Sequence, residues 1–146
     1  MSVFSAMNIS ASGMTAQRLR TDIIAQNIAN VNTTRTEDGT PYVRKTVVFS
    51  EKGVSAFSDI YTNAVGISGT GVKVSQIVED DKTAMKKVYD PSHPDADEEG
   101  YVTYPNVNSV TEMTNLIDAS RAYEANVTAF NATKAMALKG LEVGRR

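Results

Sequence analysis

The stretch SVTEMTNLIDASRAYEANVTAFNATKAMALKGLEV, residues 109–143, repeats apolar side chains at alternating three- and four-residue steps. This spacing aligns them in one row along an α-helix that would be about 50 Å long, at about 1.5 Å per residue. Ser109 followed by Glu112 matches a capping box, so we expect the helix to begin at Ser109.

Two rows run along this predicted helix. The first contains Met113, Leu116, Ser120, Tyr123, Val127, Phe130, Lys134, Ala137 and Leu141. The second is richer in alanine and contains Ala122, Ala125, Ala129, Ala132 and Met136. One row alone is typical of an ordinary amphipathic helix on its own core. Two rows favour a bundle or tube in which the helix has several neighbours.

Residues 2–31 carry a second helical pattern. One face contains Met7, Ala11, Met14, Thr21, Ile24, Ile28 and Val31, and another contains Ile9, Ala16, Leu19 and Ile23. Asn27 and Asn30 lie one turn apart beside the first face. Either they mark the end of the helix, because residues 30–34 are rich in turn formers, or they fix the register between helices as buried asparagines do.

The middle of the chain, residues 32–108, has the pattern of strands and turns. We expect strands at Tyr42–Phe49, Val72–Val78, Met85–Tyr89 and Tyr101–Tyr104, and loop or weak strand at residues 50–70. They predict a small antiparallel sheet with too little area for a core of its own. The chain therefore divides into residues 1–31, 32–108 and 109–146, and we expect it to finish folding against copies or relatives of itself.

Composition excludes several classes of function. A net charge of −2 without a basic patch argues against nucleic-acid binding, and no apolar run is long enough for membrane insertion. The 146 residues contain no cysteine and one histidine, His93, so we expect no metal, no cofactor and no catalytic site, and hence no enzyme. The first residues do not match a cleavable signal peptide.

The acidic stretch around residue 95 partly matches a calcium loop. Asp95, Asp97, Glu99 and Gly100 fit its first, third, fifth and sixth positions. The twelfth position, however, holds Asn106 in place of a bidentate glutamate, and the intervening residues have a strand pattern. A solvated acidic turn is therefore favoured, and a calcium-dependent binding module is the alternative outside the class of assembling proteins.

Several motifs then carry a resemblance. Residues 13–18 (GMTAQR) and 25–33 (AQNIANVNT) resemble the N-terminal signature of the bacterial flagellar axial family, which comprises rod, hook and hook-associated proteins. Glu112-Met113 and residues 120–126 (SRAYEAN) resemble its C-terminal signature. Residues 89–97 (YDPSHPDAD) and 100–108 (GYVTYPNVN) resemble the proximal-rod members, whose length this chain also matches. A subunit of the distal rod or hook is the alternative, and such subunits are longer.

The resemblance implies an α+β fold. Long N- and C-terminal helices would pair as an antiparallel coiled coil around an export channel, with the small antiparallel β middle domain outside. The chain would be a rod subunit in the periplasm that transmits torque to the hook. It would leave the cytoplasm through the flagellar type III export apparatus without a cleaved signal peptide. Its partners would be copies of itself, other rod proteins and the motor-ring junction proteins.

We expect the assembly interface to draw on both helices. Asn27, Met113 and Tyr123 are the predicted register and anchor positions, since aromatic anchors commonly dominate interfaces. The full predicted set is Met7, Ala11, Met14, Ile24, Asn27, Ile28, Asn30, Met113, Leu116, Tyr123, Ala125, Val127, Ala129, Phe130 and Leu141.

Overall fold

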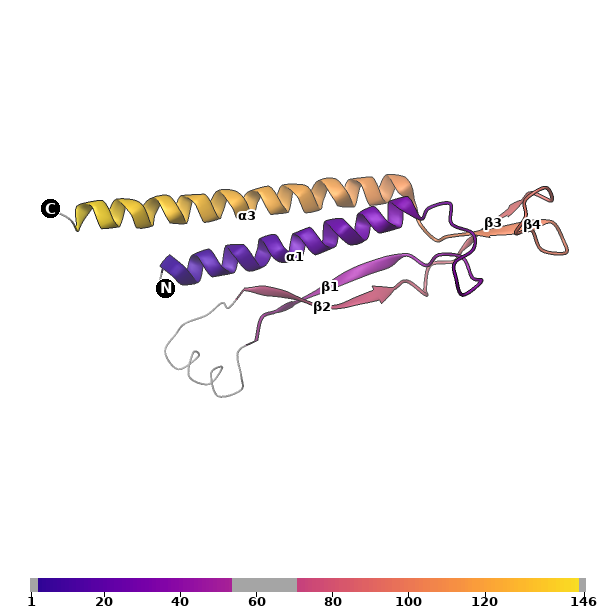
Figure 1. The fold of residues 1–146 in the computed structure, drawn as a ribbon, viewed down its shortest axis with the longest axis horizontal. Coiled ribbons are helices and arrows are strands. Elements are labelled where there is room, and N and C mark those ends of the chain that lie inside the picture. Colours follow the sequence, from indigo (N-terminus) through magenta and orange to yellow (C-terminus); the bar gives the residue numbers. More distant parts are fainter. Residues whose placement is uncertain (1–2, 54–70, 145–146) are drawn as a thin grey trace. The chain divides into compact units, whose positions relative to one another are not determined.

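The computed structural model describes residues 3–53 and 71–144. Within them the order of elements is α1 (Val3–Ala29), β1 (Lys45–Glu51), β2 (Val72–Glu79), β3 (Lys86–Tyr89), β4 (Tyr101–Tyr104) and α3 (Ser109–Val143) (Figure 1). Two long helices with short strands between them confirm the predicted α+β class. Most of the loop predicted at residues 50–70 lies outside the described residues.

Both helices match their predicted ranges closely, but the start of α3 is built differently from the prediction. The side chain of Asn108 caps the helix, because its Oδ1 accepts hydrogen bonds from the backbone N–H groups of Val110 (3.0 Å) and Thr111 (3.3 Å). The predicted capping box of Ser109 and Glu112 is wrong. The Glu112 carboxylate bonds to other partners, which are described below.

The strands also follow the prediction, with a shift at β1. It begins at Lys45, three residues after Tyr42, because the preceding residues are bonded elsewhere. Tyr42 N–H donates to the carbonyl of Thr33 (3.1 Å), and Arg44 N–H donates to Oδ1 of Asn106 (2.8 Å). The described strands form two separate two-stranded sheets, β1–β2 and β3–β4, in place of one.

The two sheets are both antiparallel. In the first, Asp80 N–H donates to the carbonyl of Arg44, and Lys52 N–H donates to the carbonyl of Gly71. Residue numbers thus rise along one strand as they fall along the other, which is the antiparallel arrangement. In the second, Lys86 pairs with Tyr104 and the pairing continues to Tyr89 with Tyr101.

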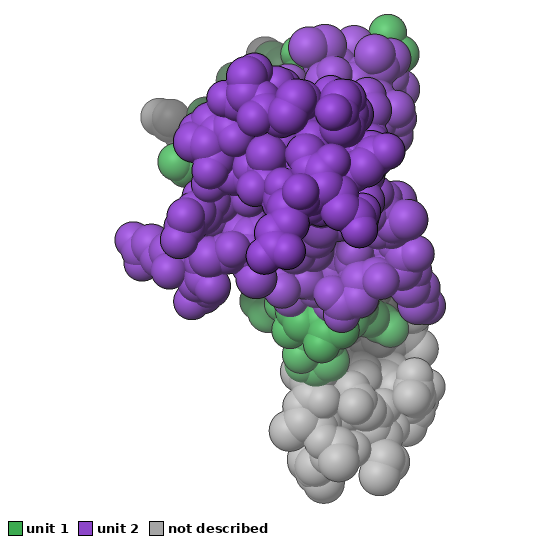
Figure 2. Space-filling model, turned by 90° about the vertical axis from the view of Figure 1, so that its right-hand side faces the viewer, with its two compact units in different colours: residues 1–19, 48–76, 119–146 green, residues 20–47, 77–118 purple. Residues whose placement is uncertain are grey.

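Two compact units make up the chain, and Figure 2 colours them separately. Unit 1 comprises Met1–Leu19, Val48–Gln76 and Ala119–Arg146, and unit 2 comprises Arg20–Val47 and Ile77–Asp118. Each unit therefore contains part of α1 and part of α3. The predicted division of the chain into domains at residues 1–31, 32–108 and 109–146 stays a prediction.

In unit 1 the two helices approach closely because small residues line the contact. A Cβ atom added at Gly13 would lie 2.5 Å from Oδ1 of Asn126, so only glycine leaves room for that side chain. Nδ2 of Asn126 donates to the carbonyl of Ala122 at 2.7 Å, which holds the amide in place. The neighbouring Ala16 and Ala119 are buried.

The start of β2 is fixed to α1 in the same unit. The Ser12 hydroxyl accepts a hydrogen bond from Val72 N–H at 3.1 Å and donates one to the carbonyl of Ile9 at 2.7 Å. Gly71 precedes Val72 and has a φ of 100°, a backbone conformation that residues other than glycine rarely adopt. The chain therefore enters β2 against α1 at a defined residue.

Contacts in the two units show the direction of helix pairing. In unit 1 Gly13 lies beside Asn126, and in unit 2 Asn27 donates to Glu112. Higher residue numbers on α1 thus meet lower numbers on α3, so the helices are antiparallel, as the sequence predicted.

Replacing Gly13 by alanine tests this close approach. Alanine favours the helix by about 1 kcal/mol, but its Cβ must displace the Asn126 amide from Ala122. We expect Gly13→Ala to lower the free energy of unfolding in the wild-type chain and to raise it by up to about 1 kcal/mol in an Asn126→Ala background. Chemical denaturation of the four proteins measures this. An equal effect of Gly13→Ala in both backgrounds would contradict the packing described.

Candidate assembly site

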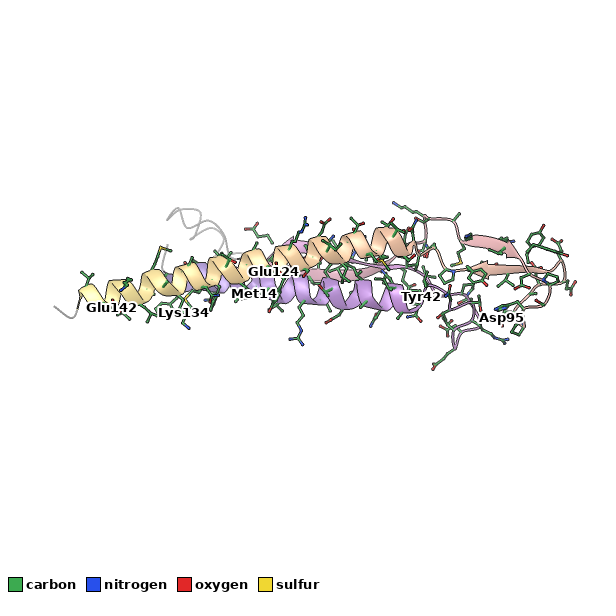
Figure 3. All side chains as sticks on the ribbon, turned by 90° about the horizontal axis from the view of Figure 1, so that it is seen from above. Met14, Tyr42, Asp95, Glu124, Lys134 and Glu142 are labelled. Carbon is green, nitrogen blue, oxygen red and sulfur yellow. The ribbon has the colours of Figure 1, made fainter. Side chains whose placement is uncertain are left out.

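Asn27, near the end of α1, is buried with 1% of its surface exposed and uses both atoms of its amide. Its Oδ1 accepts hydrogen bonds from the hydroxyl of Tyr42 (2.9 Å) and from Lys45 N–H (2.9 Å); Tyr42 is labelled in Figure 3. Its Nδ2 donates to the carbonyl of Lys45 (2.8 Å) and to Oε2 of Glu112 (3.0 Å). One side chain thus joins α1 to the start of β1 and to α3.

Glu112, in the first turn of α3, is also only 1% exposed. Its Oε1 accepts hydrogen bonds from Nε (2.9 Å) and Nη2 (2.8 Å) of Arg44, and Nδ2 of Asn115 lies at 3.3 Å. A buried carboxylate is costly unless a cation and hydrogen-bond donors surround it. Glu112 has both, so the charge ties α3 to the residue preceding β1.

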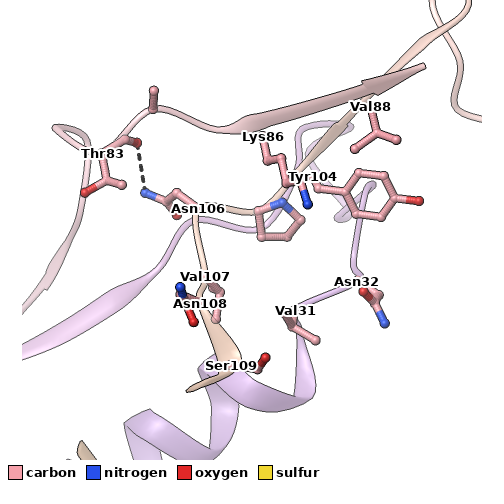
Figure 4. Close-up of a pocket in the computed structure, with 12 residues that line it drawn as sticks. Val31, Asn32, Thr83, Lys86, Val88, Tyr104, Asn106, Val107, Asn108 and Ser109 are labelled. Carbon is pink, nitrogen blue, oxygen red and sulfur yellow. Dashed lines mark hydrogen bonds between the residues drawn. The ribbon is translucent and has the colours of Figure 1, made fainter. Parts of the chain in front are cut away.

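The network continues from Arg44 to the ends of the other strands. Asn106 accepts from Arg44 N–H and donates through Nδ2 to the carbonyl of Asp80 (2.7 Å). Its Nδ2 also donates to the carbonyl of Thr83 (3.2 Å), the bond drawn in Figure 4. Nη1 of Arg44 lies 3.5 Å from the Asp80 carboxylate. Hydrogen bonds from Thr83 hold the pKa of Asp80 below its usual value, with a smaller contribution from Arg44.

We call this set of unit 2 residues the polar junction: Asn27, Tyr42, Arg44, Asp80, Asn106 and Glu112. It brings together the end of α1, the start of β1, the end of β2 and the start of α3. The side chains satisfy one another. The polar junction therefore acts as a structural clamp that sets which face of α3 meets α1.

That inward face coincides only in part with the predicted rows. The buried and half-buried residues of α3 up to Asn126 are Ser109, Glu112, Asn115, Leu116, Ala119, Ala122 and Asn126. Leu116 belongs to the first predicted row and Ala122 to the second. The apolar heptad pattern could not have found Glu112, Asn115 and Asn126, because one is charged and two are amides.

Apolar side chains instead gather on the opposite side of α3. Val110, Met113 and Ile117 are 72%, 53% and 53% exposed, and their spacing of three and four residues places them in one row. We call these three residues the outer row. Of the three, only Met113 belongs to the predicted assembly set. The missed signal was the outer row's own spacing from Val110 onward.

The predicted assembly residues thus fall into three groups. The exposed members all belong to α3 and are Met113, Tyr123, Ala125, Ala129 and Leu141. The half-buried members are Met7, Ala11, Met14, Ile28, Asn30, Leu116, Val127 and Phe130. Ile24 and Asn27 are buried within the chain.

Asparagines 27 and 30 play different parts. Asn27 joins α1 to α3 through Glu112 and not through a second asparagine, and its role in setting the register between helices stays a prediction. Asn30 belongs to the end of α1: its Nδ2 donates to the carbonyl of Gln26 at 2.9 Å, and its Oδ1 accepts from the Thr33 hydroxyl at 3.1 Å.

A cleft of about 530 Å³ lies in unit 2 between the end of α1 and the start of α3 (Figure 4). Its apolar lining comes from Val31, Ala84, Val88, Tyr104, Pro105 and Val107, and its polar lining from Asn32, Thr83, Lys86, Asn106, Asn108 and Ser109. Lys86 is the charged group of this lining. We call this pocket the unit 2 cleft.

The acidic turn holds the chain through local hydrogen bonds. Oδ1 of Asp97 accepts from the backbone N–H groups of Glu99 (3.1 Å) and Tyr101 (2.7 Å). Asp95 accepts from the Thr34 hydroxyl at 2.7 Å. Asp97 thus caps the turn, and Asp95 joins it to a residue distant in sequence. Over residues 3–53 and 71–144 no group of three or more His, Cys, Asp or Glu residues could hold a metal ion. No helix in these same ranges has the length and apolarity to cross a membrane.

Tyr42 makes the polar junction sensitive to alkali. Burial raises its pKa, and the nearby carboxylates of Glu79 and Glu112 raise it further. The folded chain therefore retains this proton at pH values where the unfolded chain has lost it. The resulting stability is fully present below the unfolded pKa and is lost as pH rises through the folded pKa.

We expect Tyr42→Phe to reduce the loss of free energy of unfolding above pH 10, the ordinary pKa of tyrosine. At neutral pH it should cost about 1 kcal/mol, because the hydrogen bond to Asn27 is lost. Denaturant unfolding from pH 7 to 11 measures both effects. Tyr89→Phe, at an exposed tyrosine, is the control and should follow the wild type. Parallel pH curves for Tyr42→Phe and the wild type would contradict this role.

Comparison with known proteins gives a consistent family. Residues 7–35 match the family described as flagella basal body rod protein, and residues 98–143 match the flagellar basal body rod FlgEFG protein C-terminal family. The chain is 49% identical to the flagellar basal-body rod protein FlgC of Bacillus subtilis, over 99% of this chain and 100% of the relative. It is 45% identical to FlgC of Borreliella burgdorferi, over 98% of each. Identity to FlgC of Salmonella typhimurium is 39%, over 99% of this chain and 100% of the relative. The chain belongs to the FlgC family of flagellar basal-body rod proteins.

Proposed function

We propose that this chain is a structural subunit of the proximal rod, which polymerises helically around the export channel and transmits motor torque to the hook. The observation that carries the proposal is the outer side of α3. Large apolar side chains are exposed there at Val110, Met113 and Ile117, in a chain that belongs to a rod-protein family. Exposed apolar side chains in a row are typical of a surface that another protein covers.

The outer row supports assembly in physical terms. Val110, Met113 and Ile117 would each contribute about 1.5–3 kcal/mol if a neighbouring subunit buried them fully. Because every subunit of a helical polymer repeats the same contacts, these contributions act in parallel along the shaft. Many desolvated interfaces in parallel resist twisting, which is what a torque-transmitting rod requires.

The remaining predicted interface residues would act in two ways. Tyr123, Leu141 and the exposed alanines 125 and 129 would contact neighbours directly from α3. Met7, Ala11, Met14, Ile28, Leu116, Val127 and Phe130 are half-buried and would complete the interface at the edges of the helix pair. Ile24, Asn27 and Asn30 would act by positioning α1 and its end.

The proposal extends to location and partners. The subunit would reach the periplasm through the flagellar type III export apparatus without a cleaved signal. It would contact copies of itself, other rod proteins and the motor-ring junction proteins. Its role would be mechanical and not catalytic.

The outer row gives a direct test in a flagellated bacterium that lacks its own copy of the gene. We expect Met113→Gln, alone or with Ile117→Gln, to reduce motility and the number of rods seen in purified basal bodies. Each fully buried side chain lost would weaken association about tenfold or more. The free energy of unfolding of the purified chain should change by less than about 0.5 kcal/mol, since both positions are exposed.

Asp118→Asn provides the matched control. Asp118 is an exposed polar residue of α3, and it lies about 100° around the helix from Ile117 and therefore off the outer row. Cells with this variant should swim normally. Normal rods and motility in the Met113→Gln, Ile117→Gln double variant would contradict the proposed use of this surface.

A further inference from the structure

The hairpin of β3 and β4 in unit 2 has an open edge along β3. In the described part of the chain, β4 is the one strand that pairs with β3 (Figure 1). Asp90 N–H donates to the carbonyl of Gly100 at 2.9 Å, so these two residues form a hydrogen-bonded pair. Such pairs alternate along antiparallel strands, and the backbone groups of Val88 therefore also point towards β4. The N–H and C=O groups of Lys87 and Tyr89 point the other way, along the open edge.

The acidic turn caps the opposite edge of the hairpin at Tyr101. Asp97 N–H donates to the carbonyl of Tyr101 (2.9 Å), and Oδ1 of Asp97 accepts from Tyr101 N–H (2.7 Å). The outward backbone groups of Lys87 and Tyr89 have no such partner among the described residues. An open edge of this kind is a template for another strand, and a two-stranded hairpin is only marginally stable in water. The β3 edge therefore favours a further strand.

The stretch Lys86–Asp90 is complementary to a second copy of itself. When two copies run antiparallel, the outward groups of Lys87 in one meet those of Tyr89 in the other, and each pair exchanges two hydrogen bonds. The same register places Lys86 opposite Asp90 of the second copy and Val88 opposite Val88. Pairs of opposite charge and pairs of β-branched residues stabilise facing strands, and an ammonium group beside a tyrosine ring is attractive.

The side chains concerned are available for these contacts. Lys86 and Lys87 are exposed and form no ion pair among the described residues. The Tyr89 ring meets the ring of Tyr101 edge-on and is still 64% exposed. Oδ1 of Asp90 accepts from the N–H (3.1 Å) and hydroxyl (2.6 Å) of Ser92, which leaves Oδ2 for an ammonium group.

Neighbouring registers are unfavourable. A shift of two residues in one direction places Lys87 opposite Lys87, and like charges directly opposite destabilise a strand pair. A shift in the other direction places Lys87 opposite Pro91, which has no N–H to donate. Lysines on a strand edge commonly discourage self-pairing. Only the register centred on Val88 keeps the lysines of the two copies apart and gives each a favourable neighbour.

We propose that β3 of one free subunit pairs antiparallel with β3 of a second copy, about a two-fold axis at Val88. The product is a four-stranded sheet in the order β4, β3, β3, β4. Such a contact is isologous, and it is complete once two copies have met. The subunits of a shaft between motor and hook would share one direction, so the β3 pair would form outside the shaft and open on assembly. The inference goes beyond the proposed function and does not depend on it.

Single introduced cysteines test the contact in the purified full chain, which has no cysteine of its own. Val88→Cys sets two thiols opposite each other at a non-hydrogen-bonded pair, whose Cα separation of about 4.5 Å suits a disulfide. Lys82→Cys is the control, at an exposed position outside β3. Because a small interface is weak, the oxidation is done at about 0.1–1 mM protein. We expect linked dimer from Val88→Cys in a yield at least about tenfold above that from Lys82→Cys, although residue 82 is the more exposed.

Charge reversal tests the register in the Val88→Cys background. Lys86→Glu sets a carboxylate opposite Asp90 at both ends of the strand pair, and we expect the yield of linked dimer to fall about tenfold. Lys82→Glu makes the same change of net charge outside β3 and should leave the yield unchanged. Both lysines are exposed, so the circular dichroism spectrum should stay that of the Val88→Cys protein.

A second pair of variants leaves Val88 in place, should Val88→Cys prevent folding. Lys87→Cys and Tyr89→Cys are both at exposed positions and meet each other across the proposed axis. A mixture of the two proteins should give linked dimer, whereas neither alone should do so, because equivalent residues at these positions do not face each other.

The outcomes separate this contact from the rod function. Equal yields from Val88→Cys and Lys82→Cys, or a Val88→Cys link that Lys86→Glu leaves unchanged, would overturn the β3 pairing without touching the rod proposal. The link should persist when Met113→Gln and Ile117→Gln are added, since both residues lie on α3. A link that disappears with these two changes would show that the copies meet through α3, and would also overturn the pairing.

Discussion

The carboxylate of Glu112 is buried at the start of α3, and a charge in that position constrains everything around it. Its partners are Arg44, 2.8 Å away, and Asn27, 3.0 Å away, which come from the β1 entry and from α1. Removing either partner would leave part of a buried charge uncompensated, a change that commonly costs about 3–5 kcal/mol. Three segments distant in sequence therefore meet where α3 begins.

This constraint separates the two sides of α3. With Glu112 turned inward, Ala119 and Asn126 follow it on the same side, and small residues on α1 such as Gly13 let the helices approach. Val110, Met113 and Ile117 are then turned outward. A buried ionic group thus specifies orientation more than it adds stability, a role known from polar residues in coiled coils. The same clamp leaves these three apolar side chains exposed.

Sequence patterns were sufficient to locate the helices and strands. They were not sufficient to show which side of each helix packs inside the chain. The three- and four-residue spacing identified both helices, and β-branched residues located strands such as Tyr101–Tyr104. Two possible rows on α3 could not be ranked, because periodicity does not say which row a partner within the chain covers. Local sequence predicts Glu112 as part of a cap because its best partner, Arg44, is distant in sequence and no local pattern relates them. For Asn27 the local sequence suggests two roles, and its bond to Glu112 is a tertiary contact that no local pattern predicts.

A double-mutant cycle between Asn27 and Glu112 tests the polar junction most directly. Denaturant unfolding of the wild type, Asn27→Ala, Glu112→Ala and the double variant yields the coupling free energy between the two side chains. A cooperative junction predicts that each single change costs about 3 kcal/mol or more and that the pair is coupled by about 1–3 kcal/mol. Single changes that each cost less than about 0.5 kcal/mol, and that add without coupling, would contradict the account.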